Sequence, residues 1–266
     1  MKTMRIAAVA SLALAPVAFA APAHAADASV SILHAVPGAT VDVYANGKAL
    51  LKNFKPGTLT DPVMLAPGTY DLKVTAAGAG EMGKAVIEAK GVTVPADANI
   101  TVVAHLDASG KPALTPYVND TSAVPAGKAR LTVRHDAAAP AVDVRANGAV
   151  ALKGLTNPNE AKATVDAGTI SADVVLAGTD TVAIGPAKVT LKEGTNTIVY
   201  AWGSAADKNL MLATQVVSGM HSAPGGVPAG GGSDSSQAGR YAAVVGAAAL
   251  AGGLVLTTRR RASAVR

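Results

Sequence analysis

The chain has 266 residues, no cysteine and a formal net charge of +5 at pH 7. Without cysteine it can form no disulfide, and it can hold neither a thiol nucleophile nor a cysteine-bound zinc ion or iron–sulfur cluster. Residues 26–239 contain 16 Lys and Arg against 18 Asp and Glu, so the positive charge comes from the two ends of the chain. The net charge of −2 in this part excludes the electrostatic signature of a nucleic-acid-binding protein, and we expect no nucleic-acid partner.

Residues 1–25 have the pattern of a secretory signal peptide. Lys2 and Arg5 give a positive start, and residues 6–20 form a largely apolar run. Ala23 and Ala25 supply the small side chains that signal peptidase requires, which predicts cleavage before Ala26; residues 18–20 are a second candidate site. We therefore expect the chain to be exported.

The middle of the chain reads as all-β. Short apolar or alternating runs are separated by Gly, Pro, Asn and Asp, which is typical of strands joined by turns. Residues 26–121 are predicted to contain strands at 29–35, 40–45, 48–51, 61–65, 69–76, 84–92, 99–106 and 113–117. Residues 128–219 are predicted to contain strands at 131–135, 142–146, 149–152, 160–166, 170–176, 182–191, 196–202 and 210–217. Eight short strands in each of these two segments predict two tandem immunoglobulin-like antiparallel β-sandwiches that are independent of each other, with residues 122–127 as their linker.

An internal repeat supports this division. The sequence V-D-V-Y-A-N-G at residues 41–47 returns as V-D-V-R-A-N-G at residues 142–148, an offset of 101. A histidine precedes each copy at the same distance, which indicates a duplicated domain. The Asn-Gly pairs, which are Asn46-Gly47 and Asn147-Gly148, are the strongest signal for a two-residue hairpin turn.

Residues 34–47, H-A-V-P-G-A-T-V-D-V-Y-A-N-G, resemble the signature of the bacterial DUF4397 family, roughly H-A-x-P-x-A-P-x-V-D-V-Y-x-N/D-G. Both copies are one residue shorter between His and Asp, and the second copy has Arg145 in place of Tyr. The resemblance covers both repeats. It implies an exported surface protein with immunoglobulin-like sandwich repeats, and it implies no catalytic residue because the family has no established activity.

The repeated ionisable pairs are the candidate ligand residues: His34 with Asp42, and His135 with Asp143. Imidazole and carboxylate groups both coordinate metals, so one reading is a metal or ligand site. The reading that we favour is structural, because a carboxylate before a turn commonly accepts backbone N–H groups and a metal site usually needs three or more ligands. We therefore predict no metal and no cofactor.

Motifs of catalysis are missing from the sequence. It contains no G-x-S-x-G elbow, no H-E-x-x-H and no phosphate-binding loop, so we predict no catalytic residues and no enzyme activity. Sugar binding by a sandwich uses exposed aromatic rings, and few are available. The aromatic residues between the signal peptide and the stalk are Tyr44, Phe54, Tyr70, Tyr117, Tyr200 and Trp202.

The C-terminal part reads as an anchor. Residues 220–240 are rich in Gly, Pro and Ser and predict a flexible stalk. Residues 241–258 carry no charge and are long enough for a transmembrane helix, and the basic tail 259–266 would stay in the cytoplasm. Small residues at Ala242, Gly246, Ala249 and Gly253 favour a weak homodimer through this helix.

An alternative for the anchor is sorting to the cell wall. The nearest match to a Leu-Pro-x-Thr-Gly sorting motif is V-P-A-G-G at residues 227–231, where Gly230 replaces the reactive Thr. We therefore expect a retained membrane anchor and an extracellular ectodomain.

Three functions compete for this sequence. The favoured one is a non-catalytic bacterial cell-surface protein for adhesion or cell-envelope interaction, with an envelope or extracellular component as its unidentified partner. A second is a carbohydrate- or metal-binding module centred on the His/Asp pairs. An exported hydrolase is the third and least favoured.

Overall fold

The computed structural model describes residues 25–221, and this part of the chain is built from strands, turns and loops. The predicted signal peptide up to residue 24, most of the stalk, the predicted transmembrane helix and the basic tail lie outside the described residues. Within residues 25–221 there is no helix of the length and apolarity that crossing a membrane requires. Residues 25–221 lie within one compact unit.

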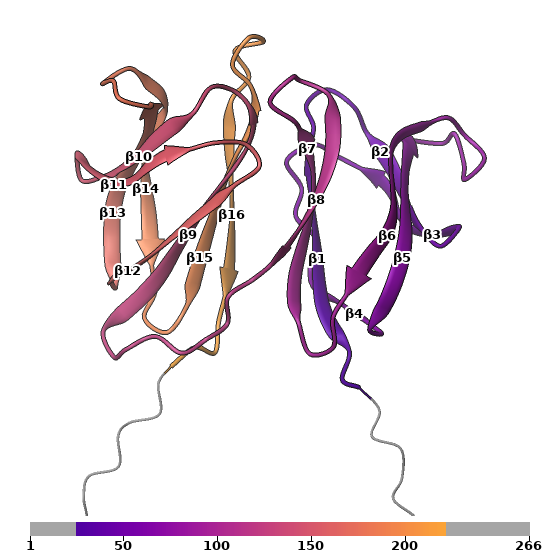
Figure 1. The fold of residues 1–266 in the computed structure, drawn as a ribbon, viewed down its shortest axis with the longest axis horizontal. Coiled ribbons are helices and arrows are strands. Elements are labelled where there is room, and N and C mark those ends of the chain that lie inside the picture. Colours follow the sequence, from indigo (N-terminus) through magenta and orange to yellow (C-terminus); the bar gives the residue numbers. More distant parts are fainter. Residues whose placement is uncertain (1–24, 222–266) are drawn as a thin grey trace, which may run out of the picture. The chain divides into compact units, whose positions relative to one another are not determined.

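The first repeat forms strands β1 to β8 and the second forms β9 to β16 (Figure 1). The strands of the first repeat are β1 (Ala28–Ala35), β2 (Val41–Ala45), β3 (Lys48–Phe54), β4 (Val63–Leu65), β5 (Gly68–Ala76), β6 (Ala85–Val94), β7 (Asn99–Leu106) and β8 (Pro112–Val118). Those of the second are β9 (Lys128–Ala138), β10 (Val142–Ala146), β11 (Ala149–Leu155), β12 (Glu160–Asp166), β13 (Gly168–Leu176), β14 (Val182–Leu191), β15 (Asn196–Ser204) and β16 (Met211–Val217). Every predicted strand has a counterpart, which confirms the all-β class.

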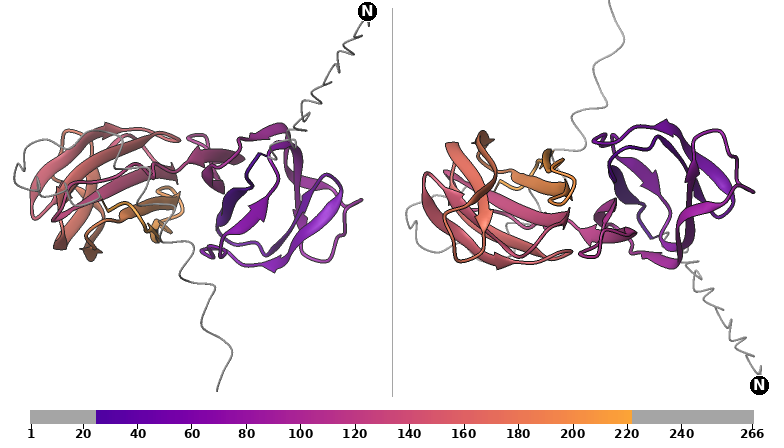
Figure 2. Two further views of the ribbon diagram at one scale, coloured as in Figure 1. Left: turned by 90° about the horizontal axis from the view of Figure 1, so that it is seen from below. Right: turned by 90° about the horizontal axis from the view of Figure 1, so that it is seen from above.

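Each repeat makes two facing four-stranded sheets (Figure 2). In the first repeat the sheet orders are β4-β1-β7-β8 and β3-β2-β5-β6; in the second they are β12-β9-β15-β16 and β11-β10-β13-β14. The equivalent orders show that both copies of the duplicated sequence adopt the same arrangement. This arrangement is a pair of sandwich-like units.

The expectation of purely antiparallel sheets is wrong at one place in each repeat. β1 pairs in parallel with β7, and β9 pairs in parallel with β15. Five strands lie between β1 and β7 in the chain, β2 to β6, and the equivalent five lie between β9 and β15. All of them except β4 and β12 belong to the opposite sheet, so each parallel pair has the long connection that parallel pairing needs. Alternation of apolar residues does not distinguish the two directions, so the sequence pattern could not reveal it.

Strands β3 and β11 run three residues further than predicted because each contains a β-bulge. The pairing register shifts between the middle of the strand and its last residue, Phe54 or Leu155. Asn53 and Gly154 lie in these bulges with φ of 54° and 64°, a conformation that favours Gly and Asn. The strands predicted to end at residues 51 and 152 therefore continue past a bulge in the structure.

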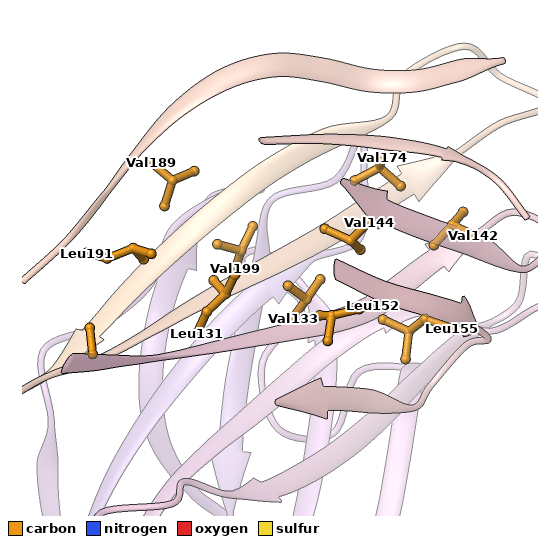
Figure 3. Packing of buried hydrophobic residues seen from close by; sticks show 11 residues of the cluster. Leu131, Val133, Val142, Val144, Leu152, Leu155, Val174, Val189, Leu191 and Val199 are labelled. Carbon is orange, nitrogen blue, oxygen red and sulfur yellow. The ribbon is translucent and has the colours of Figure 1, made fainter. Parts of the chain in front are cut away.

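The core of the second sandwich is a single cluster with side chains from both of its sheets (Figure 3). Leu131 and Val133 of β9 lie in the same cluster as Val144 of β10 and Val174 of β13. The core of the first sandwich instead divides into two clusters, one around Phe54 and one around Val30. Side chains of both clusters line the apolar cavity described below.

The outer faces of two sheets, β4-β1-β7-β8 and β12-β9-β15-β16, meet between the sandwiches. One apolar cluster combines Leu33, Val103 and Tyr117 of the first repeat with Ile198, Tyr200 and Trp202 of the second. Strand β15 is buried along its whole length because it contacts its own core on one face and the first repeat on the other. The expectation of two independent sandwiches does not include this interface.

The segment between the repeats is held in place. Val124 is buried, and its N–H donates to the carbonyl of Met220, 2.8 Å away. Arg130 donates to the carbonyl groups of Asp120 and Ser122. The predicted linker 122–127 is therefore bonded to the second sandwich, and the folded part extends to His221.

We predict that Gly148→Val lowers the stability of the second sandwich by about 1–2 kcal/mol, the cost of a left-handed conformation for a residue with a side chain. Gly148 has φ of 84° and no atom within 4 Å of an added Cβ, so the effect reports backbone strain alone. Ala149→Val, at the next and exposed position, adds the same side chain without that strain and serves as the control. Thermal unfolding followed by circular dichroism measures both variants, and equal melting temperatures would contradict the hairpin geometry.

Candidate functional site

The two repeated aspartates hold backbone N–H groups in the same way. Asp42 accepts from Asn53 N at 2.9 Å and from Gly78 N at 3.0 Å. Asp143 accepts from Gly154 N at 2.7 Å and from Gly178 N at 3.0 Å. Each carboxylate thus joins the bulge of the next strand to the turn that follows β5 or β13. The aspartate fixes two irregular backbone segments that the ladder of the sheet leaves unpaired.

The hydrogen bonds also set the charge state of these aspartates. The N–H groups of Asn53 and Gly78 lower the pKa of Asp42 below its usual value. Those of Gly178 and Gly154 do the same for the pKa of Asp143. Both carboxylates are therefore ionised and engaged with the backbone at neutral pH.

The repeated histidines contact the loop that leads to the second strand. His34 Nε2 lies 2.8 Å from the carbonyl oxygen of Ala39, and His135 Nε2 lies 3.0 Å from that of Pro140. A carbonyl oxygen can only accept, so the proton is on Nε2 in each ring. Burial lowers the pKa of His34, and the bond to Ala39 acts in the opposite direction. Both rings are buried and hold the chain reversal between the first two strands of each repeat.

The Asn-Gly pairs form tight turns and do more than turn the chain. Asn46 and Gly47 have φ of 48° and 75°, and Asn147 and Gly148 have 51° and 84°, as a type I′ turn requires. In addition, the Asn46 side chain accepts from Asp71 N at 2.8 Å, and that of Asn147 accepts from Ser171 N at 2.9 Å. Each asparagine therefore ties its hairpin to the neighbouring strand, which the sequence did not predict.

Arg145, which stands where the family signature has Tyr, pairs with a residue on the neighbouring strand. Its guanidinium makes two bonds of 2.8 Å to the carboxylate of Asp173, which lies opposite it on β13. In the first copy the facing pair is Tyr44 and Lys73. The change from Tyr to Arg accompanies the change from Lys to Asp.

The His/Asp pairs do not meet further ligating side chains. Among residues 25–221 there is no group of three or more His, Asp or Glu side chains arranged to hold a metal ion. His34 and His135 instead border apolar cavities inside the two sandwiches, with volumes of about 40 and 30 Å³. Cavities of this size are far below the roughly 150 Å³ that admits a benzene ring, so they are features of core packing.

The aromatic rings are mostly inside the molecule. Five of the six are buried, and Tyr70, which is half-buried, donates its hydroxyl to the carbonyl of Ala66. Among these six rings, only Tyr70 is partly exposed, so few ring faces are available for a sugar to stack on.

A buried polar network between the sandwiches is the chemically richest part of the described structure. The Arg134 side chain is fully buried, and its three nitrogens donate to Glu160 at 2.9 Å, to the Tyr200 hydroxyl at 2.8 Å and to Asn119 Oδ1 at 2.8 Å. Its guanidinium carbon also lies 4.1 Å from the centre of the Tyr117 ring, a cation–π contact. A buried cation is thus paired with a carboxylate and surrounded by hydrogen-bond acceptors.

Asp136 lies in the same network. The Tyr117 hydroxyl is 2.7 Å from Asp136 Oδ1 and also 2.7 Å from the carbonyl oxygen of Pro158. Asn157 donates to the carbonyl groups of Leu106 and Ala137 and so adds a further link between the repeats.

The sequence reasoning missed this network, although one signal was present. Residues 99–106 and 196–202 are nearly continuous apolar runs rather than alternating ones, which indicates burial on both faces. Arg134 lies in the predicted strand 131–135 and Asp136 directly follows it. A strand with one exposed face would place such charged side chains toward solvent. The structure places both at the interface.

Comparison with known proteins gives one match. Residues 28–145 match the family model described as domain of unknown function (DUF4397). The matched region runs from β1 through the second copy of the repeated motif as far as Arg145. A search of curated proteins finds no match.

We predict that Asp143→Asn lowers the melting temperature at neutral pH, because an amide offers one acceptor and turns a donor toward the second N–H group. The pKa of Asp143 is lower in the folded state than in the unfolded state, where it is about 3.9. The carboxylate therefore stabilises the fold at pH values above the unfolded-state pKa, and this stabilisation is lost as pH falls through the folded-state pKa. The difference between wild type and variant should therefore shrink in acid. Asp166→Asn, at an exposed carboxylate, is the control; a difference independent of pH would contradict the assignment.

Proposed function

We propose that this protein, whose residues 28–145 match the DUF4397 family model, is a non-catalytic bacterial cell-surface protein, exported and membrane-anchored, that presents two joined immunoglobulin-like sandwiches for adhesion or cell-envelope interaction. The observation that carries the proposal is the commitment of the repeated polar residues to the backbone. Asp42 and Asp143 each accept two backbone N–H groups, and His34 and His135 each contact a backbone carbonyl. Residues used in this way shape the scaffold and leave recognition to the surface of the sandwiches.

The location is proposed from the sequence. The N-terminal pattern of positive start, apolar run and small residues supports export. The uncharged residues 241–258 followed by the arginines of the tail support a single membrane span with the sandwiches outside. The Gly, Pro and Ser residues between them support a stalk that separates the sandwiches from the membrane. Attachment to the cell wall is the alternative.

The interface between the repeats supports a spacing or presenting role. Hydrogen bonds connect Tyr117 with Asp136, Asn119 with Arg134, and Thr101 with Gln215 across the two repeats. Two sandwiches joined in this way move as one body, which presents a larger surface than one sandwich on a flexible linker.

The second reading, a carbohydrate- or metal-binding module centred on the His/Asp pairs, gains less support. The rings that would stack on a sugar are buried or half-buried, and the imidazole and carboxylate groups have backbone partners. The third reading, an exported hydrolase, has no residues in this chain that we would assign to it.

A binding screen tests the proposed function. The full chain in mild detergent is titrated by calorimetry with cell-wall polymers, and its melting temperature is measured with Zn²⁺, Ni²⁺ and Ca²⁺. We expect binding to an envelope polymer that survives the double variant His34→Ala, His135→Ala, and no metal-dependent shift. A metal-dependent shift in melting that this variant abolishes, or hydrolytic turnover that persists through purification, would overturn the proposal.

Fractionation tests the location. Detergent should release the mature chain, including residues 241–266, from membranes. Release only by enzymes that digest the cell wall, with peptidoglycan fragments attached and residues 241–266 missing, would establish wall attachment instead.

A further inference from the structure

The Tyr117 hydroxyl has one proton and two close acceptors. Its oxygen lies 2.7 Å from Asp136 Oδ1 and 2.7 Å from the carbonyl oxygen of Pro158. The carbonyl of Pro158 can only accept, so a proton on the Tyr117 hydroxyl can serve either this carbonyl or Asp136, but not both. Two oxygen atoms at this distance without a proton between them repel each other. Both contacts are satisfied together only if Asp136 brings a proton of its own.

The charge balance of the interface leads to the same conclusion. The buried Arg134 guanidinium is already paired with Glu160, and its remaining nitrogens donate to Tyr200 and Asn119. Glu160 is also paired with the partly exposed Lys162, 2.9 Å away. Asp136 is fully buried and makes no ion pair among the described residues, so its ionised form would be a buried charge without a direct partner. Burial of such an uncompensated charge is costly, and the group becomes neutral instead.

The two histidines that face Asp136 have hydrogen-bond partners of their own. From β7, the His105 ring lies 2.9 Å from the carbonyl oxygen of Leu106 through Nδ1, so this nitrogen carries the proton. Its Nε2 is 2.8 Å from the Thr115 hydroxyl, which can donate to it. His135, on β9, uses Nε2 toward Pro140 and has its Nδ1 3.4 Å from Ala137 N, which can donate to it. Neither histidine ring donates to Asp136 among the hydrogen bonds of the described residues.

We propose that Asp136 is a neutral carboxylic acid that joins the two sandwiches, donating from Oδ1 to the Tyr117 hydroxyl, which in turn donates to the Pro158 carbonyl. Its Oδ2 has no hydrogen-bond partner among the described residues, which a neutral carbonyl oxygen tolerates better than a charged one. The interface is therefore a pH-sensitive contact: it is intact while Asp136 holds its proton, and it loosens when the proton is lost.

The electrostatics of the site agree with this assignment. Burial raises the pKa of Asp136, and this effect exceeds the opposing influence of His105, Tyr117, Arg134 and His135. The protonated form of a group with a raised folded-state pKa stabilises the fold. This stabilisation is complete at pH values below the unfolded-state pKa of about 3.9, and it is lost as pH rises through the folded-state pKa. Alkaline conditions should therefore weaken the interface.

Infrared spectroscopy of the full chain in mild detergent tests the proposal directly. Exposed carboxyl groups are ionised at neutral pH, since their pKa values are about 4, so a carbonyl band of a protonated carboxylic acid at this pH comes from a group with a raised pKa. We expect this band in the wild type and in Asp166→Asn, where an exposed carboxylate is removed, and its loss in Asp136→Asn. Absence of the band in the wild type at neutral pH would overturn the proposal.

The fluorescence of the single tryptophan gives a second readout. Trp202 is buried, and it lies directly opposite Asp136 in the parallel pairing of β15 with β9. As pH rises, the acid band should disappear and the Trp202 emission should change with the same midpoint. In Asp136→Asn, which keeps a donor toward Tyr117, neutral-pH stability should persist while the emission step disappears. The role of Asp136 would be contradicted if the acid band persisted in Asp136→Asn. It would also be contradicted if the wild type lost the band at high pH without a change in Trp202 emission.

Discussion

The structure depends on the burial of one guanidinium group, that of Arg134. A cation without access to water must be paired and fully hydrogen-bonded, so its position dictates that of its neighbours. Arg134 donates to Asn119, and the side-chain amide of Asn119 donates to the Thr101 hydroxyl. Thr101 donates to the side-chain oxygen of Gln215, which also accepts from the Tyr200 hydroxyl. The Tyr200 hydroxyl in turn accepts from Arg134. This closed ring passes twice between the repeats. The two sandwiches are therefore joined by directional bonds as well as by apolar contact.

Duplication explains how such an interface can arise. With the offset of 101 residues, Arg134 corresponds to Leu33 and Asp136 to Ala35, while in the parallel-paired strands Trp202 corresponds to His105. Equivalent faces of the two copies meet, as they do in a symmetric dimer, but the two faces carry different side chains. One copy supplies the charges and the other supplies Tyr117 and an apolar surface. The copies differ at the positions where they touch, whereas the V-D-V-x-A-N-G motif, which stabilises each sandwich internally, is retained in both.

Much of this could be predicted from the sequence. The positions of the strands, the Asn-Gly turns and the duplication depend on local patterns, and the structure contains each of them. The parallel pairing of β1 with β7 depends on which strands become neighbours in space, and alternation carries no information on it. The partners of Asp42 are N–H groups of Asn53 and Gly78, 11 and 36 residues away, whose identity as bulge and turn appears only in the fold. Interface residues such as Arg134 look like solvent-exposed positions until the second surface is known.

Calorimetric unfolding of the full chain is the most direct test of the account. If the Arg134 network makes the two sandwiches one body, residues 25–221 should unfold in a single cooperative transition. Arg134→Leu, which introduces the residue of the first copy, should destabilise the chain by about 3 kcal/mol because Glu160 loses its buried partner, and should separate the transition into two. Lys128→Leu, which breaks the exposed pair with Asp166, should cost no more than about 1 kcal/mol. Two separate transitions in the wild type, unaffected by Arg134→Leu, would contradict the account.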